Sequence, residues 1–387
     1  MDNTVEIMIG AIRARICGEE YIIDKSISAE QLNRLYILSK QQDMAHIVAE
    51  ELSRQGLLGD DEISAKFKKQ QMLAVFRYER INYELQEICR VLEAAKISHI
   101  PLKGSVIRQY YPEPWMRTSA DIDILINEED SERAIEAIVS ELQYQLGKKN
   151  IYDYTMTSPS GVHLELHFKA FEKGHAVNAN DILGDIWQYA YLKNGYSYHY
   201  CISDELFYFY HIAHMAKHFE YGGCGVRFYL DLWLLNHRCE FDREKREALL
   251  QKGGLLTFAQ VAEKLADIWF SGGEHNEQTL RMQAHVINNG IYGSKENNLA
   301  WSQITKGGKN QHAKDLIFLP YENMVKKYPS LKKHKILLPF YHIRRWCSIV
   351  FEGRGKASVK LLKTNSDVAK TRKDSVEKLL KDLELIK

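Results

Sequence analysis

The sequence of 387 residues lacks the features that mark several classes of protein. Its six cysteines form no Cys-x-x-Cys pair and no other metal-binding spacing, so the sequence predicts a reduced, cytoplasmic chain. The N-terminus has no basic segment followed by an apolar one, so no signal peptide is expected. No run approaches roughly 18 apolar residues, so no membrane span is expected either. Internal repeats, low-complexity tracts and Cys or Ser nucleophile motifs are also absent.

The sequence has almost no net charge, +1 at pH 7, so the whole molecule has no general attraction for nucleic acid. The charge is unevenly placed, however. The segment from Gln303 to Lys387 holds 20 Lys and Arg against 8 Asp and Glu, and the remainder holds 32 against 43. Two explanations fit this uneven distribution of charge. Either a basic C-terminal region packs on an acidic body, or the basic region forms a surface for an anionic partner. We favour the first, and we expect Tyr341–Phe351 to be a helix on that body.

The pattern of apolar residues predicts a mixed α+β fold, in which a small sheet core is embedded between N-terminal and C-terminal helical regions. Residues 1–95 read as helices, and 96–175 alternate between strands and helices, with helices expected at Val106–Tyr111 and near Glu129–Gln145. Residues 176–280 return to helix and are expected to complete a cleft. Residues 281–387 form the basic, mainly helical region. A chain of this length holds two or three domains with cores of their own.

The most informative stretch, Leu102–Ile126, reads LKGSVIRQYYPEPWMRTSADIDILI. Its last strand carries Asp121 and Asp123, which share one face because side chains alternate along a strand. Two such carboxylates repel each other unless a cation lies between them, and oxygen ligands suit Mg²⁺. The same repulsion predicts that Asp123→Asn leaves the stability of the metal-free protein almost unchanged or raises it.

The beginning of this stretch predicts a phosphate site. Gly104 and Ser105 follow a strand and should begin a helix, whose free N–H groups bind phosphate. Lys103 and Arg117 are candidates for additional positive charge. A phosphate site beside a metal-binding carboxylate pair is the arrangement that phosphoryl or nucleotidyl transfer requires.

A second pattern supplies another candidate carboxylate. Two alternating runs, Ile151–Thr157 and Val162–Phe168, flank a Ser-Pro-Ser-Gly turn and predict a hairpin. In the second run His163, Glu165 and His167 face one way, and apolar residues face the other. Alone, this pattern is typical of a solvated sheet face. After an Asp-x-Asp strand, it makes Glu165 a candidate for the same site.

The order of strand, Gly-Ser turn, helix, Asp-x-Asp strand and Glu-bearing strand resembles the DNA polymerase β-like nucleotidyltransferase superfamily. More narrowly, the LKG, DIDIL and HLELH motifs resemble the bacterial family of uncharacterised nucleotidyltransferases. The resemblance implies that Asp121, Asp123 and Glu165 are catalytic and hold one or two Mg²⁺ ions. It further implies an NTP substrate and an acceptor that the sequence does not identify.

The helices after the core contain further candidates. His211, His214 and His218 lie on one face of a predicted helix. A zinc site, a structural role and the lining of a nucleotide or acceptor pocket are all open, and the resemblance places the last, for His214, Lys217 and His218, level with the structural role. Arg227 and Asp231 then occur at i,i+4 in an otherwise apolar helix, where charges should be paired or functional. We expect both to face the cleft.

These observations predict a Mg²⁺-dependent enzyme that moves a nucleoside monophosphate from an NTP to an acceptor hydroxyl or phosphate. Two alternatives remain. One is a non-catalytic nucleotide- or partner-binding module that keeps the fold, against which the intact carboxylate trio argues. The other is an RNA-directed nucleotidyltransferase, which the basic C-terminal region would suit.

Overall fold

The computed structural model describes residues 3–171, 178–220, 222–291, 317–319, 321–332, 334–351 and 370–386, together with positions 293, 297, 301 and 304. Much of the predicted basic C-terminal region, including residues 305–316 and 352–369, therefore lies outside the described residues.

Five strands in the middle of the chain form one mixed sheet in the order β1-β2-β5-β4-β3. They are β1 (His99–Pro101), β2 (Asp121–Ile126), β3 (Gln145–Lys149), β4 (Asp153–Thr157) and β5 (His163–His167). β2 and β5 are parallel neighbours, and the other neighbouring pairs are antiparallel. The predicted hairpin is present as β4 and β5. Sequence reasoning missed β3, because the helix expected to reach Gln145 ends at Leu142.

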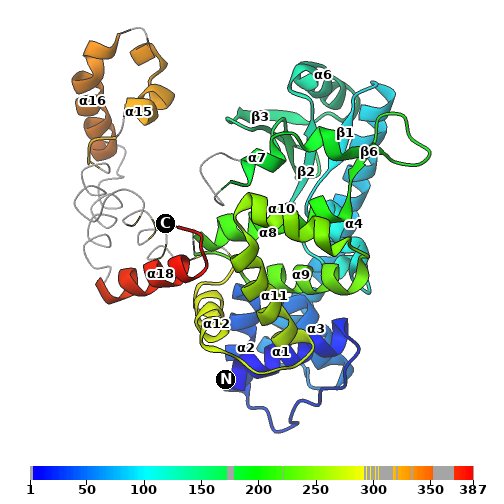
Figure 1. Ribbon diagram of the computed structural model, residues 1–387. Helices are drawn as coiled ribbons and strands as arrows, with labels where there is room; N and C mark the ends of the chain where they lie inside the picture. Colours follow the sequence, from blue (N-terminus) through cyan, green and yellow to red (C-terminus); the bar gives the residue numbers. More distant parts are fainter. Residues whose placement is uncertain are drawn as a thin grey trace.

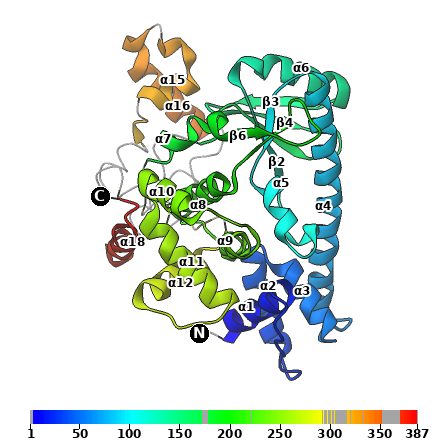
Figure 2. The ribbon, with the colours of Figure 1, turned by 45° about the vertical axis from the view of Figure 1, so that its right-hand side comes forward.

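The two faces of this sheet have different partners. On one face, apolar side chains of β2, β4 and β5 pack against α4 (Glu62–Ala94) and α6 (Ser131–Leu142). This core includes Ile122, Ile124, Ile126, Met156, Leu164, Leu166, Ile88, Val91, Leu92, Ala134 and Ile138. Figure 2 shows α4 running from the sheet down to the N-terminal helices. The opposite face therefore carries the polar side chains of β2 and β5, as strand alternation requires.

The helices before and after the sheet share one larger core. They are α1 (Asn3–Ile16), α2 (Ala29–Gln41), α3 (Ala45–Arg54), α8 (Asp204–Glu220), α9 (Val226–Arg238), α10 (Arg243–Gly253), α11 (Leu256–Phe270) and α12 (Glu277–Asn289). Figure 1 shows the blue N-terminal helices beside α11 and α12, and α1 contacts α11. Two parts of the chain that are remote in sequence thus build one helical body beside the sheet.

The segments that follow β1 and β5 contain short helices and strands. Between β1 and β2 lie α5 (Gly104–Ile107) and two 3-10 turns, Arg108–Tyr110 and Pro114–Met116, instead of the longer single helix expected there. Between β5 and α8 lie α7 (Asn180–Leu183) and a two-stranded sheet of β6 (Ala190–Leu192) and β7 (Tyr200–Ile202). This small sheet falls in a region that was expected to be helical.

The C-terminal helices have two different environments. α18 (Lys370–Asp382) packs on α12, and Leu379, Leu380 and Leu383 are buried, as their helical spacing predicts. α16 (Leu338–Phe351) contacts α15 (Tyr321–Lys327) and the preceding 3-10 turn, and both helices lie apart from the helical body in Figure 1. The expected packing of α16 on the body is therefore not seen. Among the described residues, no helix combines the length and apolar character of a membrane span.

Candidate active site

The polar face of the sheet forms the floor of a cavity of about 1120 Å³. In the parallel register of β2 and β5, Asp123 lies directly opposite Glu165. Asp121, two residues earlier on β2, points to the same side. All three carboxylates line the cavity, as does α8 from the helical body. The volume slightly exceeds the upper end of the usual range for ligand pockets, which is about 300–1,000 Å³.

Asp123 is the centre of a charged network on this floor. Its side chain is only 4% exposed, and its Oδ1 accepts a hydrogen bond from Lys103 Nζ at 2.5 Å and another from His167 Nε2 at 2.8 Å. Burial alone would raise the pKa of Asp123, but the Lys103 ammonium and the His167 hydrogen bond outweigh it and lower that pKa. His167 Nε2 also lies 3.4 Å from Glu165 Oε2. Sequence reasoning placed His167 on this face but not in the site.

Asp121 has the opposite electrostatic environment. Burial raises its pKa, and repulsion by Asp123 and Glu165 adds to that effect, while Lys103 only partly offsets it. The cavity floor therefore holds more negative charge than Lys103 neutralises. This excess is a property expected of a site that receives a cation.

The turn that carries Lys103 is strained. Lys103 has a φ of 48°, in the left-handed region that favours glycine, so its backbone is held in a costly conformation. Ser105 N–H already donates to the Leu102 carbonyl at 3.1 Å. The Ser105 hydroxyl is buried, has no partner among the described residues, and does not line the cavity. The phosphate-binding role predicted for Ser105 thus has no geometric support, because its N–H closes the turn.

The Ser119 side chain, and not that of Ser105, brings a hydroxyl to the cavity beside the Lys103 turn. It lines the cavity and lies against Gly104, where the Cβ of any larger residue would come within 3.2 Å of the Ser119 Cβ. Arg108 fixes both residues, because it donates to the Gly104 carbonyl at 2.8 Å and to the Ser119 hydroxyl at 3.0 Å. Close packing therefore favours glycine at position 104.

Arg227 and Asp231 do not form the i,i+4 pair that their spacing allows. Arg227 donates to Asp43 at 2.7 Å and to the Thr118 carbonyl at 3.0 Å, and it lines the cavity. Asp231 is fully buried and accepts two hydrogen bonds from Arg117 Nε, at 2.8 and 2.9 Å. The expectation that Asp231 faces the cleft was therefore wrong. Asp231 instead anchors Arg117, which does line the cavity.

The wall opposite the carboxylates comes from α8. His214 and His218 line the cavity, and their Nε2 atoms lie 3.1 Å apart. Burial, with a smaller contribution from nearby lysines, lowers the pKa of both imidazoles, that of His218 to about 3. Both rings are therefore neutral at pH 7. His211 also lines the cavity, and the contact of its Nε2 with the Phe228 carbonyl oxygen, at 3.1 Å, holds its ring in place.

Most of the residues predicted from the sequence are brought together. The predicted residues that line the cavity are Lys103, Gly104, Arg117, Asp121, Asp123, Glu165, His214, His218 and Arg227. Ser105 and Asp231 do not line it. Sequence reasoning missed several lining residues, namely Asp43, Thr118, Ser119, His167 and Tyr210. For His167 the signal was present in the alternation of β5, but the others have no local motif.

The donor atoms on the cavity floor fit a divalent cation. One ligand atom each of Asp123, Glu165 and His167 lies within 4.8 Å of the others. Asp121 adds a fourth donor group on the same face, and burial, with repulsion by Asp123 and Glu165, raises its pKa. Three carboxylates favour a hard ion such as Mg²⁺.

A family model described as "Uncharacterised nucleotidyltransferase" matches residues 28–271, more than half of the chain. The matched segment contains the whole five-stranded sheet, α8, α9 and every candidate residue from Lys103 to Asp231. No curated protein matches the chain.

The two aspartates should respond oppositely to neutralisation in the metal-free protein. The raised pKa of Asp121 means that its charged form destabilises the fold at pH 7, so Asp121→Asn should raise the melting temperature. The lowered pKa of Asp123 means that its charge stabilises the fold, and Asp123→Asn should lower the melting temperature because it leaves the half-buried Lys103 without its partner. This reverses the expectation from the sequence.

Melting curves at pH 7 in EDTA test this contrast. The matched control is Glu136→Gln on the exposed side of α6, which should change the free energy of unfolding by no more than about 0.5 kcal/mol. Equal shifts in the two aspartate variants, or shifts in the reverse order, would contradict the assignment of Lys103 to Asp123.

Proposed function

Because the chain belongs to the family of uncharacterised nucleotidyltransferases, we propose that it is a Mg²⁺-dependent enzyme that transfers a nucleoside monophosphate from an NTP to an acceptor hydroxyl or phosphate. The observation that carries this proposal is the meeting of Asp121, Asp123 and Glu165, from two adjacent strands, in one cavity beside the Lys103 turn.

Asp121 and Asp123 would hold the metal, with Glu165 as a further ligand or as the base. His167 and Lys103 both bond Oδ1 of Asp123, so they fix the carboxylate plane and leave Oδ2 for a cation. Mg²⁺, when bound there, supplies positive charge that neutralises the attacking and leaving oxygens. The carboxylates thus set where in the cavity the reacting phosphate lies.

Glu165 is the best-placed group to take a proton from the acceptor. Its side chain is 36% exposed, against 4% for Asp123, so an acceptor entering the cavity reaches it more easily. Its contact with His167 holds it beside the aspartates. A general base must lie within hydrogen-bond reach of the attacking hydroxyl, and an exposed carboxylate on the cavity floor meets that condition.

Lys103 would exchange partners during substrate binding. In the structure its ammonium neutralises Asp123, and attraction to Asp123 raises its pKa despite burial, so it stays charged. When a cation and a triphosphate arrive, that charge becomes available to a phosphate oxygen. Further cationic side chains line the cavity around it, namely Arg77, Lys149, Lys169, Lys217 and Arg227. The combination suits a ligand with several negative charges.

The α8 and α9 wall would contact the base or the acceptor. The neutral rings of His214 and His218 lie 5.7 and 5.2 Å from the Phe228 ring, and all three residues line the cavity. Aromatic and neutral imidazole faces stack on a planar ligand without adding charge. This wall faces the carboxylate floor, so it can hold the part of the substrate remote from the phosphates.

Removing a carboxylate should abolish turnover. We expect Asp123→Asn and Glu165→Gln to lower Mg²⁺-dependent NTP turnover by at least about a hundredfold, because each change removes charge that stabilises the transition state. Glu136→Gln is the control and should retain activity. Pyrophosphate release is measured with each of the four NTPs and with a cell extract divided into small-molecule and RNA fractions as acceptor pools.

The outcome also distinguishes the alternatives. Activity only with the RNA fraction would identify an RNA-directed enzyme. Undiminished turnover in Asp123→Asn would overturn the metal mechanism, and no pyrophosphate release under any condition would favour a binding module without catalysis.

The cavity should prefer triphosphates to diphosphates. Each phosphate lost removes at least one charge-assisted contact, worth on the order of 1.5–3 kcal/mol. We therefore expect at least a roughly tenfold weaker affinity for the diphosphate, at about 1.4 kcal/mol per factor of ten. Calorimetric titration of ATP, GTP, CTP and UTP and of their diphosphates, with and without Mg²⁺, measures this. Equal affinities, or binding indifferent to Mg²⁺, would speak against a transferase.

A further inference from the structure

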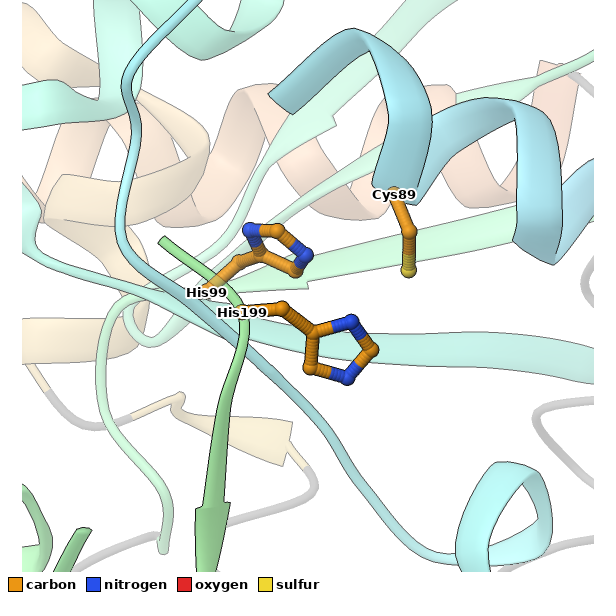
Figure 3. Close-up of side chains that lie close together, drawn as sticks. All are labelled: Cys89, His99 and His199. Carbon is orange, nitrogen blue, oxygen red and sulfur yellow. The ribbon is translucent and has the colours of Figure 1, made fainter. Parts of the chain in front are cut away.

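A second group of metal-ligating side chains lies outside the cavity. It consists of Cys89 on α4, His99 at the start of β1 and His199 just before β7. One ligand atom of each lies within 4.8 Å of the other two. Figure 3 shows the two imidazole rings next to each other, with the Cys89 side chain reaching toward them from α4. None of the three lines the cavity, so they are not part of the proposed active site.

His99 presents a nitrogen lone pair that nothing nearby uses. The side chain is fully buried, and its Nδ1 lies 3.0 Å from the Ile97 carbonyl oxygen. A carbonyl only accepts, so Nδ1 carries the proton and Nε2 carries the lone pair. Nε2 is buried without a hydrogen-bond partner among the described residues. A ring fixed by a backbone carbonyl with its other nitrogen free is the usual arrangement of a metal-ligating histidine.

His199 also has a buried ring nitrogen that makes no hydrogen bond with a described residue. It is 8% exposed, and its Nδ1 is buried without a partner in the described part of the chain. Its ring centroid lies 4.8 Å from that of His99. Burial lowers the pKa of both rings, that of His199 to about 3, so both are neutral at pH 7. Neutral imidazole is the form that binds metal. Two neighbouring ring nitrogens that are buried without hydrogen-bond partners cost free energy, unless a ligand binds both.

Cys89 supplies the third donor, and its environment includes charges of both signs. The thiol is half-buried, and burial raises its pKa to about 12. Lys193 and Glu93 are the charged groups that act on Cys89, with opposite effects on that pKa. Coordination to a metal deprotonates a thiol even where burial opposes this.

Hydrogen bonds outside the three candidate ligand side chains hold this group together. His99 N–H donates to the Tyr198 carbonyl at 2.9 Å, which brings the segment before β7 against β1. Glu93, one helical turn after Cys89 on α4, accepts hydrogen bonds from the backbone N–H groups of Ser197 and Tyr198 at 2.6 and 3.0 Å. The donor atoms are therefore positioned in advance, which favours binding over a site that must be assembled.

We propose that Cys89, His99 and His199 bind Zn²⁺, with the fourth position taken by water or by an external ligand. One thiolate and two imidazoles suit Zn²⁺ and not Mg²⁺, and three protein ligands with one open position are a common zinc arrangement. The ion would fasten the segment before β7 to α4 and to the edge of the sheet. The proposal does not depend on the nucleotidyltransferase function.

Zinc titration of the full-length protein tests the proposal. The protein is stripped with a chelator and titrated with Zn²⁺ in competition with a chromophoric chelator, and we expect one tightly bound equivalent. Cys89→Ser and His199→Gln should each weaken zinc affinity at least about a hundredfold. Mutation of a residue that only hydrogen-bonds to a metal ligand already lowers metal affinity about ten- to a hundredfold, and these changes remove a ligand itself. Cys239→Ser, which alters another half-buried cysteine, should bind as the wild type does.

Two additional measurements assign the ion to this group. Co²⁺ in place of Zn²⁺ should give a sulfur-to-cobalt charge-transfer band that Cys89→Ser loses and Cys239→Ser keeps. Asp123→Asn, in the other possible ligand group, should retain the tight equivalent. No stoichiometric zinc in the wild type, wild-type affinity in both Cys89→Ser and His199→Gln, or loss of the zinc in Asp123→Asn would overturn the proposal.

Discussion

The contact between Lys103 and Asp123 is the interaction on which the site depends. Three carboxylates crowd one sheet face, and the Lys103 ammonium, on a strained turn, offsets part of their charge. Burying such charges is expensive unless they are paired, so the strain at Lys103 is maintained by the ion pair that it makes possible. In the proposed mechanism, a cation that enters the cavity would compete with Lys103 for the charge of Asp123. Binding of the metal would therefore be coupled to the movement of the Lys103 ammonium from Asp123 to a phosphate oxygen.

The helical body is what turns a polar sheet face into a cavity. Helices from both ends of the matched segment share one core, and that core fixes α8 and α9 opposite β2 and β5. Polar contacts tie the body to the loop before β2. Arg117 in the loop donates to Asp231, and Thr118 accepts from Arg227 through its carbonyl and donates to Asp43 through its hydroxyl. Removing either partner of the buried Arg117 pair would leave a charge without compensation.

Sequence reasoning succeeded where the signal is local. Alternation along β2 and β5 is a property of each strand, so the shared face of Asp121 and Asp123 and the candidacy of Glu165 could be read directly. It failed where the partner is remote. No residue near Asp231 in the sequence indicates that Arg117 is its partner. The cysteine spacings likewise gave no hint of Cys89 beside two histidines, because the bridge between His99 and His199 and the hydrogen bonds from residues 197 and 198 to Glu93 on α4 bring them together.

The most direct test of this mechanism is a crystal structure with a non-hydrolysable NTP and Mn²⁺, whose anomalous signal locates the metal. We expect a peak bound by Asp121 and Asp123 next to the phosphates, with Lys103 Nζ moved from Asp123 Oδ1 to a phosphate oxygen. A peak away from these carboxylates, or a nucleotide outside the cavity, would contradict it.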